Sequence, residues 1–358
     1  MRAPRIVLAA AVTLAPWALQ GWTTAGPPLP SGQQAAGIVT DPREPNVVYA
    51  SDSKGFFRSD DHGSHWTQLS ATSLTSVLAI DPREPDILYA GNANGGVEKT
   101  TDGGHTWISV DEGLTCTDVH GIAVSPSSSN VVYAAAGNIS HSPEQCGNVF
   151  RSDDFGAHWW ANGWFADSIA VDPSSPDIAY AISFVFLGSG LARTTDGGAS
   201  WENLSFFPAG AFAIDPANPH HLYASGILPD DVPVARTSIY ESLDRGDSWQ
   251  VLSRPDAPLL TFLLVDPANP GVLFGSNPGN GIVGGGVFRS GDGGRTWQPF
   301  GLENEPVASL SIDARGEFLH ASVSGKGIFD TPISRSRAFP AASSGSATVP
   351  AHRPALIP

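Results

Sequence analysis

Lysine and cysteine are scarce in this sequence. Only three lysines (Lys54, Lys99 and Lys326) and two cysteines occur among its 358 residues, and 19 basic residues stand against 35 acidic ones, which gives a formal net charge of −16. Nucleic acid and anionic membrane surfaces select for basic patches. The composition therefore argues against both as partners, and we interpret the negative charge as a solubility feature.

Recognisable catalytic and cofactor motifs are also absent. The sequence contains no serine–histidine–acid set, no zinc-binding motif and no phosphate loop, and its glycine-rich segment Gly279–Gly286 precedes an expected strand rather than a helix. We therefore assign no catalytic residue, no metal ligand and no cofactor, and we expect the chain to be a monomer.

Only the N-terminus has a long apolar run. Arg2 and Arg5 precede the segment Ile6–Leu19, and small residues follow it. This pattern predicts a signal peptide over residues 1–25, and hence a secreted or periplasmic protein. A signal anchor is the alternative, but Pro16 interrupts the run and the run is short for a membrane span. Cleavage between Ala18 and Gln20 and cleavage after Ala25 both remain open.

One octapeptide occurs six times, and its last copy is Ser290–Trp297. Each copy reads Ser/Thr, any, Asp, any, Gly, any, Ser/Thr/His, Trp. The central aspartates lie 41, 52, 42, 48 and 48 residues apart, and they are Asp61, Asp102, Asp154, Asp196, Asp244 and Asp292. The closing tryptophans are Trp66, Trp107, Trp159, Trp201, Trp249 and Trp297. A turn repeated with a period in the forties predicts a β-propeller.

A second repeat, Asp-Pro-x-x-Pro followed by apolar residues and Tyr-Ala, precedes each octapeptide. Asp41 to Tyr49 is its first copy, Ser125 replaces the aspartate in the third, and Asp313 with His320 forms an eroded seventh. The average interval of about 45 residues is typical of a four-stranded blade. We predict an all-β fold, a seven-bladed β-propeller over residues 26–333, followed by a disordered Ser/Ala/Pro tail over 334–358.

The seventh blade has no octapeptide and therefore lacks an outer strand. The segment Trp22–Gly26 is similar to Trp297–Gly301, and each precedes a first-strand pattern. We predict that the Trp22 region supplies the closing strand, because pairing the two chain ends removes open sheet edges. This prediction requires signal cleavage before Trp22.

The octapeptide is the pattern called the Asp-box. The chain resembles the Asp-box (BNR-repeat) propellers, which include sialidases, xyloglucan-degrading hydrolases, the sortilin-type receptor domain and the photosystem assembly propellers. The resemblance covers about residues 36–333 and implies a propeller in which the Asp-box residues are structural. It implies little about activity, because enzymes and non-enzymes share the box.

Strand alternation places the Asp-Pro turns and the Asp-boxes on one face of the ring and the irregular loops on the other. We expect binding on the irregular loops, because binding residues concentrate there. Cys116 and Cys146 both fall on the irregular face of blade 3, and in an exported chain they predict a disulfide.

Two groups of residues on the irregular face are candidates for ligand binding. The first is an aromatic group that would form an exposed apolar patch: Trp164, Phe165, Phe184, Phe186, Phe206 and Phe207. The alternative for these is packing between blades. The second is His120 and Asp167 at equivalent inner-strand positions, which with Asp52 or Asp118 would bind a cation or ligand at the mouth of the central channel. The alternative is solvated polar side chains around a water-filled channel.

The resemblance to sialidases would imply a tyrosine nucleophile and three arginines that hold the substrate carboxylate. Five of the six tyrosines occupy the Tyr-Ala repeat, and Tyr240 directly precedes a box region, so none is left for that role. The resemblance to two-propeller xyloglucan hydrolases would imply one carboxylate from each of two rings, and a single ring cannot supply that pair. We therefore predict a non-catalytic scaffold that binds a protein or glycan. The alternative is a glycoside hydrolase that uses two carboxylates from Asp118, Asp167, Asp230 and Asp231.

Overall fold

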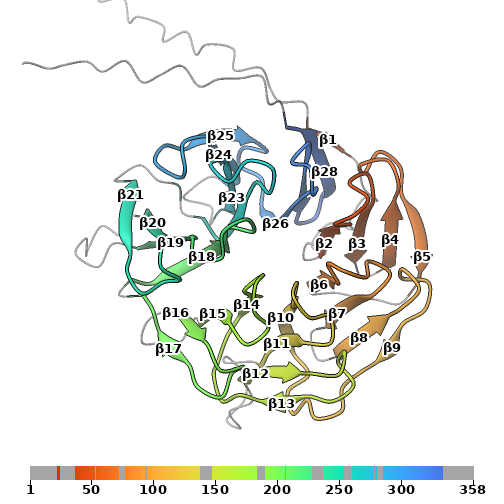
Figure 1. The fold of residues 1–358 in the computed structure, drawn as a ribbon. Helices are drawn as coiled ribbons and strands as arrows, with labels where there is room; N and C mark the ends of the chain where they lie inside the picture. The colour runs from red at the N-terminus through yellow and green to blue at the C-terminus, as the bar shows by residue number, and fades with distance from the viewer. Residues whose placement is uncertain are drawn as a thin grey trace, which may run out of the picture.

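The computed structural model is a ring of seven four-stranded antiparallel sheets around a central axis (Figure 1). It describes residues 22–24, 37–52, 54–71, 77–92, 95–137, 147–183, 190–205, 207–227, 237–253, 258, 260–277, 279 and 285–333. All the regular elements within these ranges are strands. The predicted seven-bladed β-propeller is therefore confirmed.

Six blades take their four strands from one continuous stretch of chain. The first three are blade 1, with β2 (Ile38–Thr40), β3 (Val48–Asp52), β4 (Gly55–Ser59) and β5 (Thr67–Ser70); blade 2, with β6 (Val77–Ile80), β7 (Leu88–Asn92), β8 (Gly96–Thr100) and β9 (Ile108–Ser109); and blade 3, with β10 (Val119–Val124), β11 (Val132–Gly137), β12 (Gly147–Ser152) and β13 (Trp160–Ala161). The next three are blade 4, with β14 (Ser168–Val171), β15 (Ala179–Ser183), β16 (Gly190–Thr194) and β17 (Glu202–Asn203); blade 5, with β18 (Ala209–Ile214), β19 (Leu222–Ile227), β20 (Thr237–Ser242) and β21 (Gln250–Ser253); and blade 6, with β22 (Phe262–Val265), β23 (Leu273–Asn277), β24 (Gly286–Ser290) and β25 (Gln298–Gly301). Blade 7 joins both chain ends, with β26 (Val307–Ile312), β27 (Phe318–Val323), β28 (Gly327–Pro332) and β1 (Thr23–Thr24).

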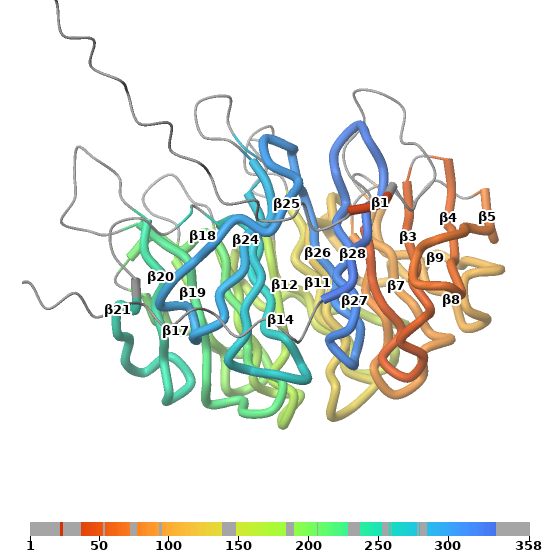
Figure 2. The backbone as a smooth tube through the Cα atoms, turned by 90° about the horizontal axis from the view of Figure 1, so that it is seen from above, coloured from red at the N-terminus to blue at the C-terminus, as the bar shows by residue number. Residues whose placement is uncertain are grey.

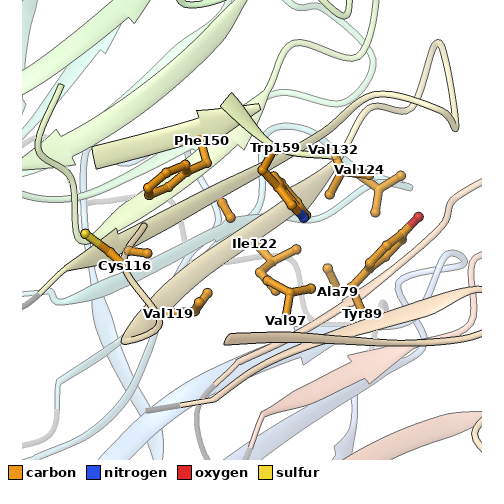
Figure 3. Packing of buried hydrophobic residues seen from close by; sticks show 12 residues of the cluster. Ala79, Tyr89, Val97, Cys116, Val119, Ile122, Val124, Val132, Phe150 and Trp159 are labelled. Atoms are coloured by element: carbon orange, nitrogen blue, oxygen red, sulfur yellow. The ribbon is translucent and has the colours of Figure 1, made fainter. Parts of the chain in front are cut away.

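The core lies between neighbouring blades rather than inside any one of them. In the cluster of Figure 3, Tyr89 and Val97 of blade 2 pack against Val119, Phe150 and Trp159 of blade 3. Each sheet is thus covered on both faces, and burying such side chains stabilises the fold by about 25 cal/mol per Å² of apolar surface. This explains why the second strands are apolar or small without strict alternation, since every residue of β3, β7 and β15 is buried.

The ring is closed by the N-terminal strand, as predicted. β1 pairs antiparallel with β28, with Thr23 opposite Asp330 and Thr24 opposite Phe329 (Figure 1). The Trp22 indole N–H donates to the carbonyl of Phe300 at 2.9 Å, and the two rings meet edge to face. The closing strand therefore also ties blade 7 to blade 6. Signal cleavage after Ala25 would remove it, whereas cleavage between Ala18 and Gln20 would keep it.

We expect Trp22→Ala to lower the free energy of unfolding by about 2–4 kcal/mol, because it removes a half-buried ring and leaves the Phe300 carbonyl without its donor. Chemical denaturation monitored by circular dichroism measures this loss. Gln298→Ala, at an exposed position of outer strand β25, is the control and should cost less than about 0.5 kcal/mol. Equal losses in both variants would show that Trp22 does not hold the ring closed.

Each Asp-box is a hydrogen-bonded turn centred on its aspartate. In blade 4, Asp196 accepts hydrogen bonds from the hydroxyls of Ser200 and Thr194 and from the Ser200 N–H, while the Thr194 hydroxyl accepts from the Gly198 N–H. The backbone bonds recur in the other five boxes, and the bond from the seventh residue comes from a hydroxyl in three of them and from the imidazoles of His65 and His158 in blades 1 and 3. The bonds from Ser200 and Thr194 lower the pKa of Asp196 to about 2. The box aspartates thus hold their turns, as the sequence predicts.

The box tryptophans sit at the boundaries between blades. Trp159 is 4% exposed and donates its indole N–H to the Val110 carbonyl of blade 2. The other five are half-buried, and three of them, Trp66, Trp107 and Trp297, donate to the glycine carbonyl of their own turn. Their role is therefore partly to pack and partly to cap the turn.

Several predictions concern residues outside the described ranges. They include residues 1–21 of the leader, the 334–358 tail and Cys146. Cys116 itself is buried, and within the described ranges no cysteine is free. The leader, the tail and the Cys116–Cys146 disulfide stay predictions.

Candidate functional site

Strands cross the ring from one face to the other (Figure 2), so each connection belongs to one of two faces. We call the face that carries the Asp-Pro turns and the Asp-boxes the turn face, and the opposite one the loop face. First strands start and second strands end at the loop face. Asp52 ends β3, Asp118 directly precedes β10, His120 lies on β10 and Asp167 directly precedes β14. All four predicted polar residues therefore lie at the loop face.

The central feature of this face is a contact between Asp118 and His120. The His120 Nε2 atom is 2.9 Å from the carbonyl oxygen of Gly137, to which it donates, and 3.5 Å from Asp118 Oδ2. The Asp118 backbone carbonyl accepts from the Gly137 N–H at 2.8 Å. The other carboxylate oxygen, Asp118 Oδ1, is buried and has no hydrogen-bond partner within the described ranges. The Asp118 carboxylate thus lies beside the His120 imidazole and has one oxygen without a described partner.

A β-bulge presents His120 at this point. Val119 pairs with Ala136 and Gly121 pairs with Ala135, so His120 is the extra residue on β10. A bulge bends a strand and changes the direction of the side chain, and bulges are frequent beside active sites. The sequence shows no signal for this bulge, because the spacing from His120 to Ser125 equals that from Asp167 to Asp172.

The same bulge region brings blade 3 close to Asp167 of blade 4. A Cβ atom on Gly121 would lie 3.3 Å from the Cα atom of Ser168, so the two inner strands nearly touch there. His120 and Asp167 each directly precede one of these contacting residues. Asp167 is half-buried, and its backbone N–H donates to the Ile182 carbonyl at 2.8 Å. Asp167 therefore lies at the start of the inner strand next to the one that carries Asp118 and His120.

Asp52 lies at the same face but is mainly structural. Its Oδ1 atom accepts hydrogen bonds from the N–H groups of Lys54 and Gly55 at 2.7 and 3.1 Å, which caps the β3–β4 turn. The side chain is 3% exposed, and Oδ2 has no hydrogen-bond partner within the described residues. Asp52 is therefore less accessible to a ligand than His120, whose side chain is 39% exposed.

The described aromatic candidates pack between blades. Phe207 is 2% exposed and stacks on Tyr240 with ring centroids 3.6 Å apart. Trp164 stacks on Trp201 at 6.2 Å, and Phe165 is half-buried. Phe184, Phe186, Phe206, Asp230 and Asp231 lie outside the described residues. The predicted exposed patch therefore stays a prediction for Phe184, Phe186 and Phe206 alone, and the proposed catalytic use of Asp230 and Asp231 also stays untested.

One further carboxylate was not anticipated from the sequence. Glu98 occupies the β8 position at which blades 1, 3 and 6 carry the aromatic residue before arginine. Burial, and secondly the charge of Asp111, raises the pKa of Glu98, and its Oε2 atom has no partner in the described structure. The glutamate at a position where other blades carry an aromatic residue is the sequence signal that could have identified it.

No site for a metal ion emerges, since the described ranges hold no group of three or more histidine, cysteine or acidic side chains placed to bind one. Nor do those ranges contain a helix with the length and hydropathy of a membrane span.

The chain is similar in sequence to parts of xyloglucanases. No protein-family model matches it. It is 30% identical over 156 residues to a xyloglucanase of Paenibacillus sp, which is 38% of this chain and 14% of that protein. It is 25% identical over 241 residues to a xyloglucanase of Hypocrea jecorina, which is 54% of this chain and 28% of that protein. The matches thus span less than a third of either relative.

Solved structures show the same fold. The GH74 xyloglucanase from Xanthomonas campestris aligns with a TM-score of 0.65 and 20% identity over 89% of this chain and 54% of that chain. YCF48 bound to D1 peptide aligns with a TM-score of 0.60 and 16% identity over 87% and 97%. At these identities the likeness concerns the propeller alone.

These comparisons correct the functional prediction. A non-catalytic scaffold was the first expectation and a glycoside hydrolase the alternative. The curated relatives found by sequence are xyloglucanases, so the scaffold prediction is wrong and the alternative is the better supported. The error arose because the repeat accounts for every tyrosine, which argues against sialidases but carries no information about hydrolases that use aspartates.

Proposed function

We propose that this chain is a glycoside hydrolase module that acts on a neutral β-glucan of the xyloglucan class. The observation that carries the proposal is its sequence similarity to xyloglucanases, at 30% identity over 156 residues with the Paenibacillus enzyme. The loop face supports it with two carboxylates and a histidine on adjacent inner strands. Glycoside hydrolysis needs little more than two carboxyl groups on either side of the scissile bond.

Asp118 and Asp167 are the proposed acid–base pair. One carboxyl group donates a proton to the leaving oxygen, and the other accepts a proton from water or attacks the anomeric carbon, depending on their separation. The Asp118 side chain is 13% exposed, and its Oδ2 atom lies 3.5 Å from His120 Nε2, whereas Oδ1 is buried without a described partner. His120 is the proposed positioning residue, since its Nε2 atom is anchored on the Gly137 carbonyl beside Asp118.

The charge of the chain selects the substrate class. A net charge of −16 repels polyuronates and other anionic polysaccharides, whereas it leaves neutral glucans unaffected. The expected leader over residues 1–25 would deliver the chain to the compartment in which such polysaccharides occur. We therefore propose a neutral glycan as the partner and an extracytoplasmic location.

The test is release of reducing ends from xyloglucan, unsubstituted β-1,4-glucan and polygalacturonate by the purified protein. We expect release from xyloglucan and none from polygalacturonate at low salt, with the rate on xyloglucan unchanged at high salt because a neutral substrate needs no screening. A folded protein that releases nothing from any neutral glucan would contradict the proposal.

A further inference from the structure

The junction between blades 7 and 1 differs in its side chains from the other junctions. In several blades a tyrosine on the second strand and a cation on the third face the box turn of the next blade. The hydroxyls of Tyr89, Tyr133 and Tyr180 donate to carbonyls of the next blade at 3.0, 2.9 and 3.4 Å. In blade 7 the register places His320 at the tyrosine position, opposite Asp330 at the position of the cation. Blade 7 thus has neither the tyrosine nor the cation that face the next blade elsewhere in the ring.

The box turn of blade 1 is altered in the same place. His62 occupies a left-handed conformation with φ of 58°, at the position where three other boxes carry Gly103, Gly197 and Gly293. Its ring stacks on Phe318 with centroids 4.1 Å apart, and Phe318 in turn lies parallel to His320 at 6.4 Å. Two imidazoles, one from each blade, therefore lie beside one phenyl ring at the junction.

His320 is entirely buried, and neither ring nitrogen has a hydrogen-bond partner within the described residues. The hydroxyls of Ser309, Ser322 and Thr331 in the same blade are also buried without a described partner. Unpaired buried polar atoms weaken packing by about 1–3 kcal/mol each. The apolar cluster at this junction is also small, with four buried residues against twelve between blades 2 and 3. We therefore expect this junction to be less stable than the junction between blades 2 and 3.

We propose that the junction between blades 7 and 1 is an acid-sensitive latch, in which protonation of His320 opens the junction and releases β1 from β28. A buried imidazole without an acceptor is stable only in its neutral form. Opening exposes the ring to water, where it takes up a proton at its ordinary pKa near 6.5. Acid therefore pulls the equilibrium toward the open state.

The direction follows from the charged groups around the ring. Burial first, and then the charge of His62, lowers the pKa of His320 to about 3 in the closed state. Between pH 6.5 and 3 the open state thus binds one more proton, and closure weakens as the pH falls. Asp330 acts in the opposite sense, because burial raises its pKa despite the hydrogen bond from Thr23, so it neutralises earlier in the closed ring. Asp61 lies beside it and pairs with His65 at 2.6 Å.

Two further acidic residues lie near the junction. Asp313 and Glu317 lie in the β26–β27 turn, where Asp313 accepts hydrogen bonds from the N–H groups of Arg315, Glu317 and Phe318. Burial raises the pKa of the box aspartate Asp61, but the hydrogen bonds from His65 and Ser59 outweigh it and lower that pKa to about 2. If backbone amides of blades 7 and 1 alone become less protected from hydrogen exchange between pH 6.5 and 4.5, the change therefore reports on the histidines.

Hydrogen exchange followed by mass spectrometry at several pH values, corrected for the intrinsic rate, tests the proposal on the full chain. In the wild type the opening constant of segments 318–332 and 37–52 should approach a tenfold rise per pH unit below 6.5, which gives about 50-fold from 6.5 to 4.5. The opening constants of segments 119–137 and 168–183, in blades 3 and 4, should not show this pH dependence. His320→Phe should abolish the slope, and His105→Phe, at an exposed histidine of blade 2, should retain it.

Other outcomes would overturn the latch. A flat wild-type profile, equal loss of protection in all blades, or a slope that survives His320→Phe would each do so. His320→Tyr, which restores the residue of five other blades, serves if the phenylalanine variant does not fold. Imidazole NMR signals of the wild type need no variant at all, and a His320 ring that is protonated at pH 5.5 while β1 remains paired would contradict the proposal.

Discussion

Asp118→Asn is expected to reduce the rate of xyloglucan hydrolysis by about 10²–10⁴-fold, the usual contribution of a positioned general acid or base. The substitution keeps the shape of the side chain but removes the transferable proton. It should leave the fold intact, because the backbone bond from the Gly137 N–H to the Asp118 carbonyl is unaffected and Asp118 Oδ1 has no described partner to lose. Initial rates of reducing-end release, with a thermal melt of each variant, measure both quantities.

Asp167→Asn should give a loss of the same order, because the two carboxyl groups act in one step. The double variant should then be little worse than the poorer single variant, since residues that act as a unit are not additive. Glu303→Gln, at an exposed acid between β25 and β26, is the matched control and should keep the full rate. Activity within twofold of wild type in both Asp118→Asn and Asp167→Asn would remove this pair from the mechanism.

The ring was predictable because its information is local and repeated. Each Asp-box carries the side chains that hold its own turn, as the bonds from Ser200 and Thr194 to Asp196 show, so the sequence of eight residues is enough to recognise it. The closing strand was also predictable, since Trp22 repeats the position of an outer-strand tryptophan and meets Phe300 in the neighbouring blade.

The site was less predictable, because it depends on contacts between blades. The approach of Gly121 to Ser168 brings Asp167 near the His120 bulge, and neither a repeat nor a motif encodes that distance. Positions that break the repeat are the sequence signal that could have indicated such residues. Glu98 and His320 each replace the residue that the repeat predicts, and each lies where burial shifts the pKa of the side chain.

The largest effect on stability is expected from Gly104→Ala, at about 3–5 kcal/mol. An added Cβ atom would lie 2.1 Å from Phe56 Cε1, and the backbone φ of +98° is itself unfavourable for alanine. Phe56 has no room to move, because it is fully buried, stacks on Tyr49 at 5.5 Å and meets Trp107 edge to face at 5.0 Å. Overpacking and strain therefore add together. The free energy of unfolding from denaturant titration measures the loss.

The adjacent residue provides the control. Gly103 also has a positive φ, of +68°, but an added Cβ atom there would meet nothing closer than 3.6 Å. The equivalent position holds His62, Phe155 and Arg245 in three other boxes, all with φ near 60°, so side chains are tolerated in that conformation. Gly103→Ala should accordingly cost only about 1–2 kcal/mol, the backbone term alone. If the two variants lost equal stability, the contact with Phe56 would contribute nothing, and the requirement for glycine at the fifth box position would be purely conformational.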